Sequence, residues 1–175
     1  MTGRNAARAT ELLTFELRTA ARVDAKCGPD EGCVPAVVTT QPRIGLDSLL
    51  APLLPLVMKS PAGRIVNISS LNGQRGQFGQ ANYAAAKAGM HGFTMTLAQE
   101  GAAKGITANT VAPGYVKTPM TDAIREDIRE GIIATIPMKR MALPEEIASA
   151  VSFLAAEQQA YITGAIIPLN GAFFM

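Results

Sequence analysis

The clearest pattern of apolar and polar positions begins near residue 63 and continues toward the C-terminus. The segment "GRIVNISS" (63–70) is a short β-branched run entered from a glycine, which predicts a buried strand. The Ala-rich segment 80–105 has apolar residues three and four positions apart and ends at a glycine, which predicts a helix. "ITANTVAP" (106–113) predicts the next strand, which ends at a proline followed by a glycine.

The same alternation continues through the last third of the chain. A second helix is predicted over residues 121–135. Another helix starts at Pro144, because proline suits the first turn and the two glutamates that follow suit the helix dipole. "AIIPLNG" (165–171) is the last predicted strand. Strands that alternate with helices in this way indicate half or more of a parallel α/β sheet with right-handed crossovers.

The first 62 residues carry a weaker pattern. Residues 3–21 have leucines on one face of an expected amphipathic helix, and residues 46–60 predict an apolar helix interrupted by prolines. The stretch between them is loop-like, with one strand expected at Val37–Thr39. We find no internal repeat and no low-complexity tract, so a single domain over residues 1–175 is expected.

Composition excludes several classes of function. The chain has 175 residues, of which 48% are hydrophobic and 17% charged, which suits one domain with a sizeable core. The sixteen Lys and Arg residues are scattered and leave a net charge of only +2, which argues against a nucleic-acid partner. Cys27 and Cys33 form neither a disulfide framework nor a C-x-x-C pair. No apolar run suits a membrane span or a signal peptide, so a cytoplasmic setting is expected.

Candidate chemistry lies in "SSLNGQRGQFGQANYAAAK" (69–87). Residues four apart share one face of a helix, so the ammonium of Lys87 is expected near the phenol of Tyr83. A phenol ordinarily titrates near pH 10, and a nearby cation stabilises its phenolate, which makes proton transfer to a substrate oxygen feasible at neutral pH. Ser70 follows the predicted strand at its carboxyl end, where open parallel sheets bind ligands. We therefore predict Ser70, Tyr83 and Lys87 as catalytic residues acting on one carbonyl.

The spacing of Tyr83 and Lys87 also has a simpler interpretation. Tyr-x-x-x-Lys alone is a common helical pair, and most examples form a solvated face. The full constellation is more specific. It places a serine at a strand end, a tyrosine thirteen residues later, a lysine four residues after that, and then the strand and turn "NTVAPGYVKT".

"GRIVNISS", "NYAAAKAG" and "NTVAPGYVKTPM" resemble the short-chain dehydrogenase/reductase family. Within that family, "NGQRGQFGQANYAAAKAGMHGFTMTLAQE" and "IPMKRMALPEEIASAVSFL" are most similar to the acetoacetyl-CoA reductases and the 3-oxoacyl reductases of fatty-acid synthesis. The resemblance covers about residue 62 to the C-terminus. It implies that Ser70, Tyr83 and Lys87 are the catalytic serine, tyrosine and lysine, and that Lys87 also holds the nicotinamide ribose.

The resemblance also implies binding residues. The cofactor is expected to be NADP, with NAD as an alternative, and the substrate an acyl thioester. Residues 119–140 would cover the substrate. The residues implied for the cofactor are Arg4, Tyr83, Lys87, Pro113, Gly114, Val116 and Thr118, and those implied for the substrate are Gln77, Phe78, Gln80 and Tyr115.

The sequence departs from the family at its N-terminal side. The family opens with a strand and a T-G-x-x-x-G-x-G turn that binds the cofactor phosphates, and no such turn occurs here. Its nearest imitation, "GPDEGCV" (28–34), has Val34 for the last glycine and two acidic residues that would repel phosphate. The family's N-N-A-G strand end is also missing, and Pro42 stands near the position of a usual asparagine. Residues 1–13 resemble the exit of the second strand, with Arg4 approaching the 2′-phosphate.

We therefore predict a partial Rossmann-like, doubly wound parallel sheet that lacks the first strand and the Gly-rich turn. Residues 1–62 would be a degenerate N-terminal part of a truncated chain, and residues 63–175 the catalytic half. One hypothesis is NADPH-dependent reduction of a 3-oxoacyl thioester. The alternative is a truncated, non-catalytic homologue that acts only as an oligomer subunit. Acyl chain length, coenzyme A against carrier protein, and NADPH against NADH are left open.

The remaining distinctive residues have structural interpretations. His91 lacks a second histidine or a carboxylate partner, so we expect a helix-surface residue and no metal site. The methionines at 90, 95, 120, 138 and 141 are expected to pack in the core or in the substrate cover. Small residues on the helix 80–105 could let a second helix approach closely, and they are Ala84, Ala85, Ala88, Gly89 and Gly92. The family resemblance makes a homo-oligomer, a dimer or a tetramer, the expected assembly.

Overall fold

The computed structural model of the chain describes residues 22–23, 36–39 and 54–175. Their strands form one sheet in the order β1-β2-β3-β4-β5, in which β1 runs antiparallel to β2 and all other neighbours are parallel. The strands are β1 Arg22–Val23, β2 Ala36–Thr39, β3 Arg64–Ile68, β4 Thr107–Pro113 and β5 Ile166–Leu169. The predicted parallel α/β class and the predicted strands in residues 36–175 are confirmed.

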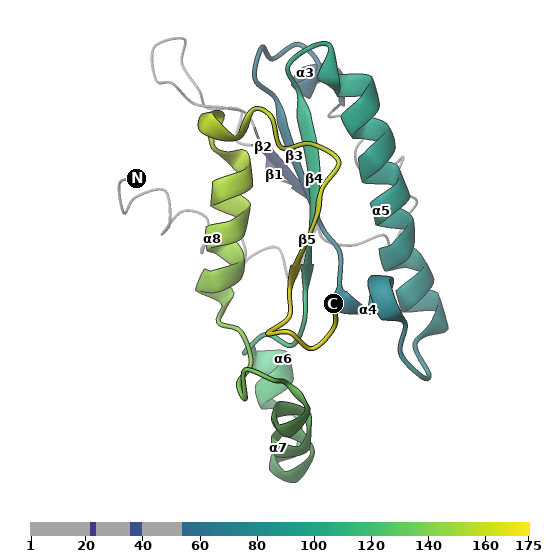
Figure 1. The fold of residues 1–175 in the computed structure, drawn as a ribbon, viewed down its shortest axis with the longest axis vertical. Coiled ribbons are helices and arrows are strands. Elements are labelled where there is room, and N and C mark those ends of the chain that lie inside the picture. The colour runs from purple at the N-terminus through teal and green to yellow at the C-terminus, as the bar shows by residue number, and fades with distance from the viewer. Residues whose placement is uncertain (1–21, 24–35, 40–53) are drawn as a thin grey trace.

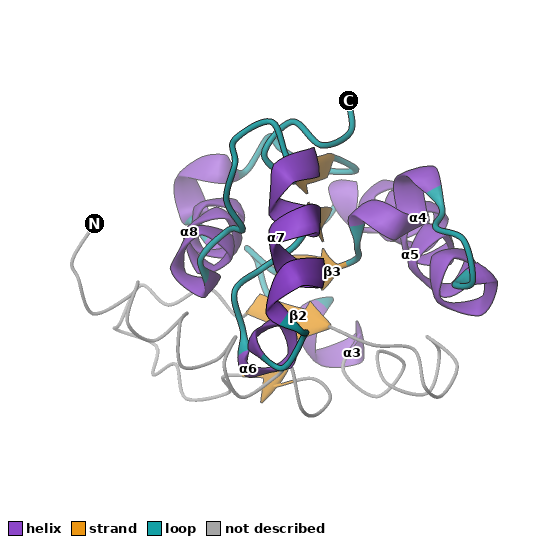
Figure 2. Cartoon of the chain, turned by 90° about the horizontal axis from the view of Figure 1, so that it is seen from below, coloured by secondary structure: helices purple, strands orange, loops and turns teal. Residues whose placement is uncertain are grey.

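Helices cover both faces of this sheet, with α5 on one side and α8 on the other (Figures 1 and 2). The short helices α6 and α7 project beyond the carboxyl end of β4 (Figure 1). The described helices are α3 Leu54–Val57, α4 Leu71–Arg75, α5 Ala81–Ala102, α6 Pro119–Asp122, α7 Glu126–Thr135, α8 Pro144–Ala155 and a 3₁₀ turn at Glu157–Gln159.

Alternating side chains along β3 supply both halves of the core. Ile65 belongs to a cluster with residues of α5, among them Leu97 and Ala98. Val66 and Ile68 belong to the cluster on the opposite face, with residues of α8 that include Val151. Since each fully buried aliphatic side chain contributes roughly 1.5–3 kcal/mol, this two-sided burial fixes β3 as a central strand.

A buried polar network fixes α5 on the sheet. Asn67 Nδ2 on β3 donates to Thr94 Oγ1 at 2.7 Å, and Thr110 Oγ1 on β4 donates to the same oxygen at 2.8 Å. Thr94 Oγ1 in turn donates to the Met90 carbonyl at 2.7 Å. All three side chains are buried, so a shift of α5 along the sheet would leave polar groups unpaired.

One helix prediction differs from the structure, and one helix of the structure was not predicted. The helix expected over 121–135 is two helices, α6 and α7, because Thr118 caps a first turn that starts at Pro119 and because the backbone of Arg125, with φ −52° and ψ 138°, is not helical. The helix α4 is an element that sequence patterning did not indicate. The helix expected over 3–21 lies outside the described residues, as does most of the one expected over 46–60, of which Leu54–Val57 is described.

The crossing of α4 and α5 requires a glycine at residue 73. A Cβ on Gly73 would lie 2.7 Å from the carbonyl carbon of Lys87 and 2.9 Å from the backbone nitrogen of Ala88. Both atoms belong to the backbone of α5, so neither can move aside as a side chain would. This contact sets α4 directly against the turn of α5 that carries Lys87.

We expect Gly73→Ala to destabilise the fold by roughly 1–3 kcal/mol, because the added methyl group forces the two helices apart. Urea denaturation followed by circular dichroism measures the change. Gly131→Ala is the matched control, since a Cβ there meets no atom within 4 Å in the middle of α7, and it should stabilise by roughly 0.5–1 kcal/mol. Equal effects of the two variants would contradict the close crossing.

Among the described residues, no helix has both the length and the apolar character that a bilayer span requires.

Candidate functional site

The candidate site lies where β3 and β4 end side by side. Ile68 at the end of β3 is in register with Val111 near the end of β4, so both strands end at the same edge of the sheet. From there β3 continues into α4, and β4 continues through residues 114–118 into α6 (Figure 1). Ligands of open parallel sheets bind at such carboxyl edges.

Ser70 is the N-cap of α4. Its extended backbone ends the β3 segment, and its Oγ accepts a hydrogen bond from the backbone N–H of Asn72 at 3.2 Å. This cap uses the hydroxyl as an acceptor. The proton of the same hydroxyl therefore remains available for an acceptor on a ligand.

Lys87 and Tyr83 lie together on α5, as the sequence predicted from their spacing. Lys87 Nζ is 5.8 Å from the centre of the Tyr83 ring and donates to the carbonyl of Ile68 at 2.8 Å. Lys87 is 3% exposed, whereas Tyr83 is 42% exposed. Burial lowers the pKa of Lys87 from 10.5 to about 8. The ammonium thus bridges the tyrosine and the strand end that leads into Ser70.

The predicted substrate residues Gln77 and Gln80 are held by a residue that the sequence analysis did not single out. Asn72 Nδ2 donates to Gln77 Oε1 and to Gln80 Oε1, both at 2.9 Å. Because the side-chain oxygen of each glutamine accepts from Asn72, each side chain presents its amide N–H groups as donors for a ligand. Phe78 between them is fully exposed, at 103%. Asn72 gave no sequence signal, because one polar residue after a strand has no periodicity.

The predicted cofactor segment after β4 is shaped by neighbouring loops. Pro113 is the last residue of β4, and Val116 forms an isolated parallel bridge with Ala142. Gly114 has a packing reason to be glycine, since a Cβ there would lie 3.0 Å from Asn170. Thr118 caps α6. The predicted residue Arg4 lies outside the described residues.

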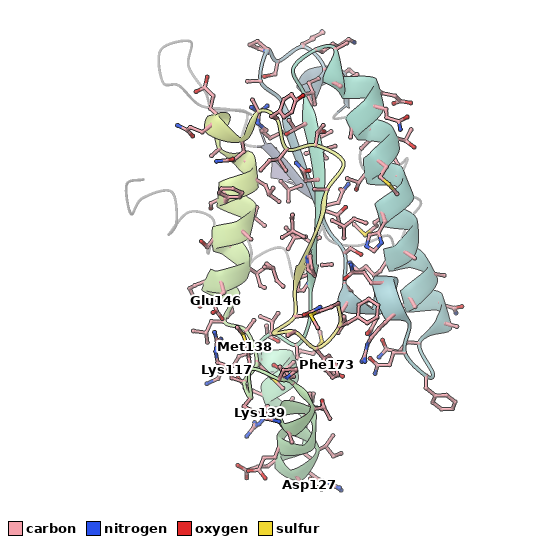
Figure 3. The ribbon with its side chains drawn as sticks, in the orientation of Figure 1. Lys117, Asp127, Met138, Lys139, Glu146 and Phe173 are labelled. Atoms are coloured by element: carbon pink, nitrogen blue, oxygen red, sulfur yellow. The ribbon has the colours of Figure 1, made fainter. Side chains whose placement is uncertain are left out.

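Tyr115, the fourth predicted substrate residue, is packed by the C-terminal segment. The rings of Tyr115 and Phe173 are 6.1 Å apart and tilted by 52°. The guanidinium of Arg75 on α4 lies 4.3 Å from the centre of the Phe173 ring. Phe173 therefore joins α4 to the segment after β4 at the edge of the sheet (Figure 3). Only the tertiary structure brings these three residues together.

His91 is buried, so the prediction of a helix-surface residue at this position is wrong. The side chain is buried, with 9% exposure, and Nε2 lies 2.8 Å from Ser69 Oγ. It shares the face of α5 that carries Lys87, and this face lies against β3. A polar residue on that face is buried because Ser69 supplies a hydrogen-bond partner.

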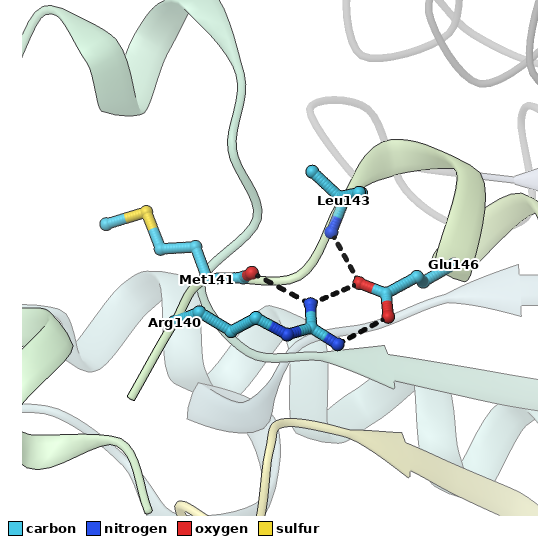
Figure 4. Close-up of polar contacts among 4 residues, drawn as sticks. All are labelled: Arg140, Met141, Leu143 and Glu146. Atoms are coloured by element: carbon cyan, nitrogen blue, oxygen red, sulfur yellow. Dashed lines mark hydrogen bonds and ion pairs between the residues drawn. The ribbon is translucent and has the colours of Figure 1, made fainter. Parts of the chain in front are cut away.

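A cavity in the described part of the chain is lined by none of the three predicted catalytic residues. It has a volume of about 290 Å³ and is lined by residues of two segments, 138–146 and 168–172. Arg140 and Glu146 at its wall form a bidentate ion pair with two contacts of 2.7 Å, and Glu146 also accepts from the backbone N–H of Leu143 at 2.7 Å (Figure 4). The hydrogen bond from Arg140 has the largest effect on the Glu146 carboxyl, and together with that from Leu143 it lowers the pKa of Glu146 to about 2. The carboxylate thus caps α8 and ties it to the loop after α7.

The methionines expected in the core or the cover divide between these environments. Met90 and Met141 are buried in the core, whereas Met95, Met120 and Met138 are exposed. Among the described residues, no group of three or more His, Cys, Asp or Glu side chains could hold a metal ion.

Comparison with known proteins places this chain in a family. The family model described as enoyl-(acyl carrier protein) reductase matches residues 44–173. Over 113 residues, 65% of this chain and 46% of the relative in each case, the chain is 67% identical to the acetoacetyl-CoA reductase of Allochromatium vinosum and 62% identical to that of Cupriavidus necator. It is 50% identical over 119 residues to the 3-oxoacyl-acyl-carrier-protein reductase FabG of Vibrio harveyi, covering 68% of this chain and 49% of the relative.

The chain spans about half the length of these curated relatives. The matched region contains α4, α5 and the segment after β4, which together carry the described part of the candidate site. The chain belongs to the short-chain dehydrogenase/reductase family.

Proposed function

We propose that the chain carries the active site of an NADPH-dependent reductase that converts a 3-oxoacyl thioester, such as acetoacetyl-CoA, into the 3-hydroxyacyl thioester. The observation that carries this proposal is the position of Lys87 Nζ, 5.8 Å from the Tyr83 ring and bonded to the strand end before Ser70. The names of the relatives, acetoacetyl-CoA reductase among them, support the choice of substrate.

Each of the three residues has a role that follows from its contacts. Tyr83, half exposed at the sheet edge, donates its proton to the carbonyl oxygen of the substrate. Ser70 donates its hydroxyl proton to the same oxygen, because the helix cap uses that hydroxyl only as an acceptor. The ammonium of Lys87 stabilises the negative charge left on the phenolate.

The donors at the sheet edge fit the nicotinamide end of NADP. The ammonium of Lys87 and the hydroxyls of Tyr83 and Thr118 suit the ribose hydroxyls and the carboxamide, and Pro113, Gly114 and Val116 would lie along this end. When bound, NADPH supplies a hydride to the carbonyl carbon. Arg4 remains the proposed contact for the 2′-phosphate, and NAD is the alternative cofactor.

This sequence offers fewer hydrogen-bond donors to the pyrophosphate of the cofactor than the family pattern does. The family's T-G-x-x-x-G-x-G turn does not occur in the chain. Each charge-assisted hydrogen bond to a phosphate is worth roughly 1.5–3 kcal/mol, so the loss of three would raise the dissociation constant by about a thousandfold or more. We therefore expect cofactor affinity well below that of a chain with the full turn.

The thioester would lie along the loop between α4 and α5. Gln77 and Gln80 present amide donors there because Asn72 holds their carbonyl oxygens. Phe78 offers an exposed apolar ring to the acyl or pantetheine chain, and Tyr115 is steadied by Phe173. Coenzyme A and acyl carrier protein would both present such a pantetheine chain with its acyl group.

A second candidate function is that of a non-catalytic oligomer subunit. The middle of the outer face of α5 is exposed and carries small or apolar residues, which are Ala85, Ala88, Gly89, Gly92 and Met95. A Cβ at Gly89 or Gly92 would meet no atom, so a second helix could approach the backbone closely. We propose a homo-oligomer through this face under either function.

The wild-type chain separates the two functions. If it is a reductase, titration with NADPH up to millimolar concentration should change cofactor fluorescence, and acetoacetyl-CoA should then drive oxidation of NADPH. Sedimentation velocity run in parallel reports the oligomer. An oligomer that binds no NADPH up to millimolar concentration would contradict the reductase and favour the non-catalytic subunit.

A further inference from the structure

His91, Ser69 and Lys87 form a buried cluster where the end of β3 meets the middle of α5. His91 Nε2 lies 2.8 Å from Ser69 Oγ, and Ser69 Oγ donates to the backbone carbonyl of Lys87 at 2.8 Å. Ser69 is 4% exposed and also donates its backbone N–H to Val111 at 2.8 Å. The side chain of His91 therefore contacts the residue that directly precedes Ser70.

The direction of these hydrogen bonds fixes the tautomer of the imidazole. A carbonyl oxygen only accepts, so the single hydroxyl proton of Ser69 is donated to Lys87. Ser69 Oγ must then accept from His91, which requires a proton on Nε2. Burial lowers the pKa of His91 and so favours the neutral ring, in which Nδ1 carries no proton.

Lys87 is consequently held at two points by consecutive residues of one strand end. Its ammonium donates to the carbonyl of Ile68, and its own carbonyl accepts from Ser69. The hydrogen bond from His91 sets the rotamer of Ser69, on which the second contact depends. A change at His91 would therefore reach Lys87 and Ser70 together, although His91 lies one helical turn beyond Lys87.

We propose that His91 is a positioning residue that, through Ser69, sets the placement of Lys87 relative to Ser70. This inference rests on the proposed reductase function, in which those two groups act on one substrate. His91 itself touches Ser69 and does not act on the substrate. Its requirement is a donor at Nε2, which an amide of similar reach can also supply.

The first test reads the tautomer directly and needs no activity. His91 is the only histidine in the 175 residues, so a long-range ¹H–¹⁵N spectrum of ¹⁵N-histidine-labelled chain reports this ring alone. At neutral pH we expect the proton on Nε2 and none on Nδ1. In Ser69→Ala, the Nε2 resonance should move because its acceptor is gone. A proton on Nδ1, or a spectrum that Ser69→Ala leaves unchanged, would overturn the proposal.

The second test uses rescue by a conservative variant. In the full chain, His91→Leu removes the donor, and His91→Gln keeps an N–H donor near the position of Nε2. We expect His91→Leu to lower kcat by roughly tenfold to a hundredfold with little change in KM for acetoacetyl-CoA, since geometry at the reacting carbonyl is altered. His91→Gln should stay within a few-fold of wild type. Equal kcat for both variants, after correction for folded fraction, would overturn the positioning role.

Failure of the reductase function is distinguishable from failure of this inference. If the wild-type chain shows no turnover, the ¹⁵N resonance of the Lys87 ammonium, titrated with pH, replaces kcat as the readout. His91→Leu should then shift the titration midpoint of Lys87, and His91→Gln should leave it close to wild type. Coincident titrations in all three chains would overturn the proposal.

Discussion

Replacing Tyr83 by phenylalanine should lower acetoacetyl-CoA-dependent oxidation of NADPH by roughly 10²- to 10⁴-fold, the usual contribution of a positioned proton donor. Phenylalanine keeps the ring beside the Lys87 ammonium and removes only the hydroxyl. Because Tyr83 is 42% exposed and on a helix surface, the free energy of unfolding should change by no more than about 0.5 kcal/mol. The loss would therefore lie in kcat and leave the fold intact.

Tyr161→Phe is the matched control for this variant. Tyr161 is also exposed, at 101%, and lies in the turn after the 3₁₀ helix, away from the sheet edge. Its hydroxyl has no part in the proposed chemistry, so this variant should keep the wild-type rate. Steady-state rates at saturating NADPH compare the two. If Tyr83→Phe retained the wild-type kcat, Tyr83 could not be the proton donor.

Lys87→Met should change the pH dependence of stability by an amount that denaturation can measure. Burial lowers the pKa of the folded-state ammonium from 10.5 to about 8, so folded Lys87 carries the full cost of burying a charge below about pH 8. Between about pH 8 and 10.5 the unfolded chain still holds the proton that the folded chain has lost, so wild-type stability rises with pH.

The methionine variant lacks this titration. The free energy of unfolding of wild type relative to Lys87→Met should therefore increase between pH 8 and 10.5, by roughly 3 kcal/mol for a displacement of about 2.5 pH units. The variant also loses the hydrogen bond from the ammonium to the Ile68 carbonyl, which lowers its free energy of unfolding by a constant amount. The sign of the change with pH does not depend on that amount. Urea denaturation at a series of pH values measures the difference.

Lys104→Met provides the control for Lys87→Met, because Lys104 is exposed in the turn that follows α5. Its stability relative to wild type should stay constant over the same pH range. In a turnover assay, Lys87→Met should also lose activity, since the group that stabilises the phenolate is gone. A pH profile of Lys87→Met that runs parallel to that of wild type would show that the lysine is not buried as a charge.

The pattern of strands and long helices could be predicted from the sequence because it depends on local spacing. β3, β4 and β5 follow from β-branched runs between glycines and prolines, and α5 follows from its Ala-rich composition with apolar residues every three or four positions. The proximity of Lys87 to Tyr83 has the same origin, since four residues make about one helical turn.

The family resemblance, carried by short motifs around Ser70, Tyr83 and Pro113, also came from the sequence alone. The match of residues 44–173 to the family model agrees with it. The roles of the individual site residues stay predictions, which the variants of Tyr83, Lys87 and His91 are designed to test.

Tertiary packing decided the features without local periodicity. Nothing in "LNGQR" predicted a helix, because a glycine in the interior of a helix disfavours it. The reason for a glycine at residue 73 is the close approach of α5, which leaves no room for a side chain there. The burial of His91 depends on a serine that lies 22 residues earlier in the chain. The contact of Phe173 with Arg75 spans most of the described length.

The amino-acid sequence by itself thus determined strands β2 to β5, the long helix and the pairing of a phenol with an ammonium, because each depends on residues a few positions apart. Only the folded chain decided which polar side chains are buried and which backbone groups hold them, as for His91, Ser69 and Asn72. The physical reason is that burial and hydrogen-bond partners arise from elements distant in sequence, and no local spacing encodes them.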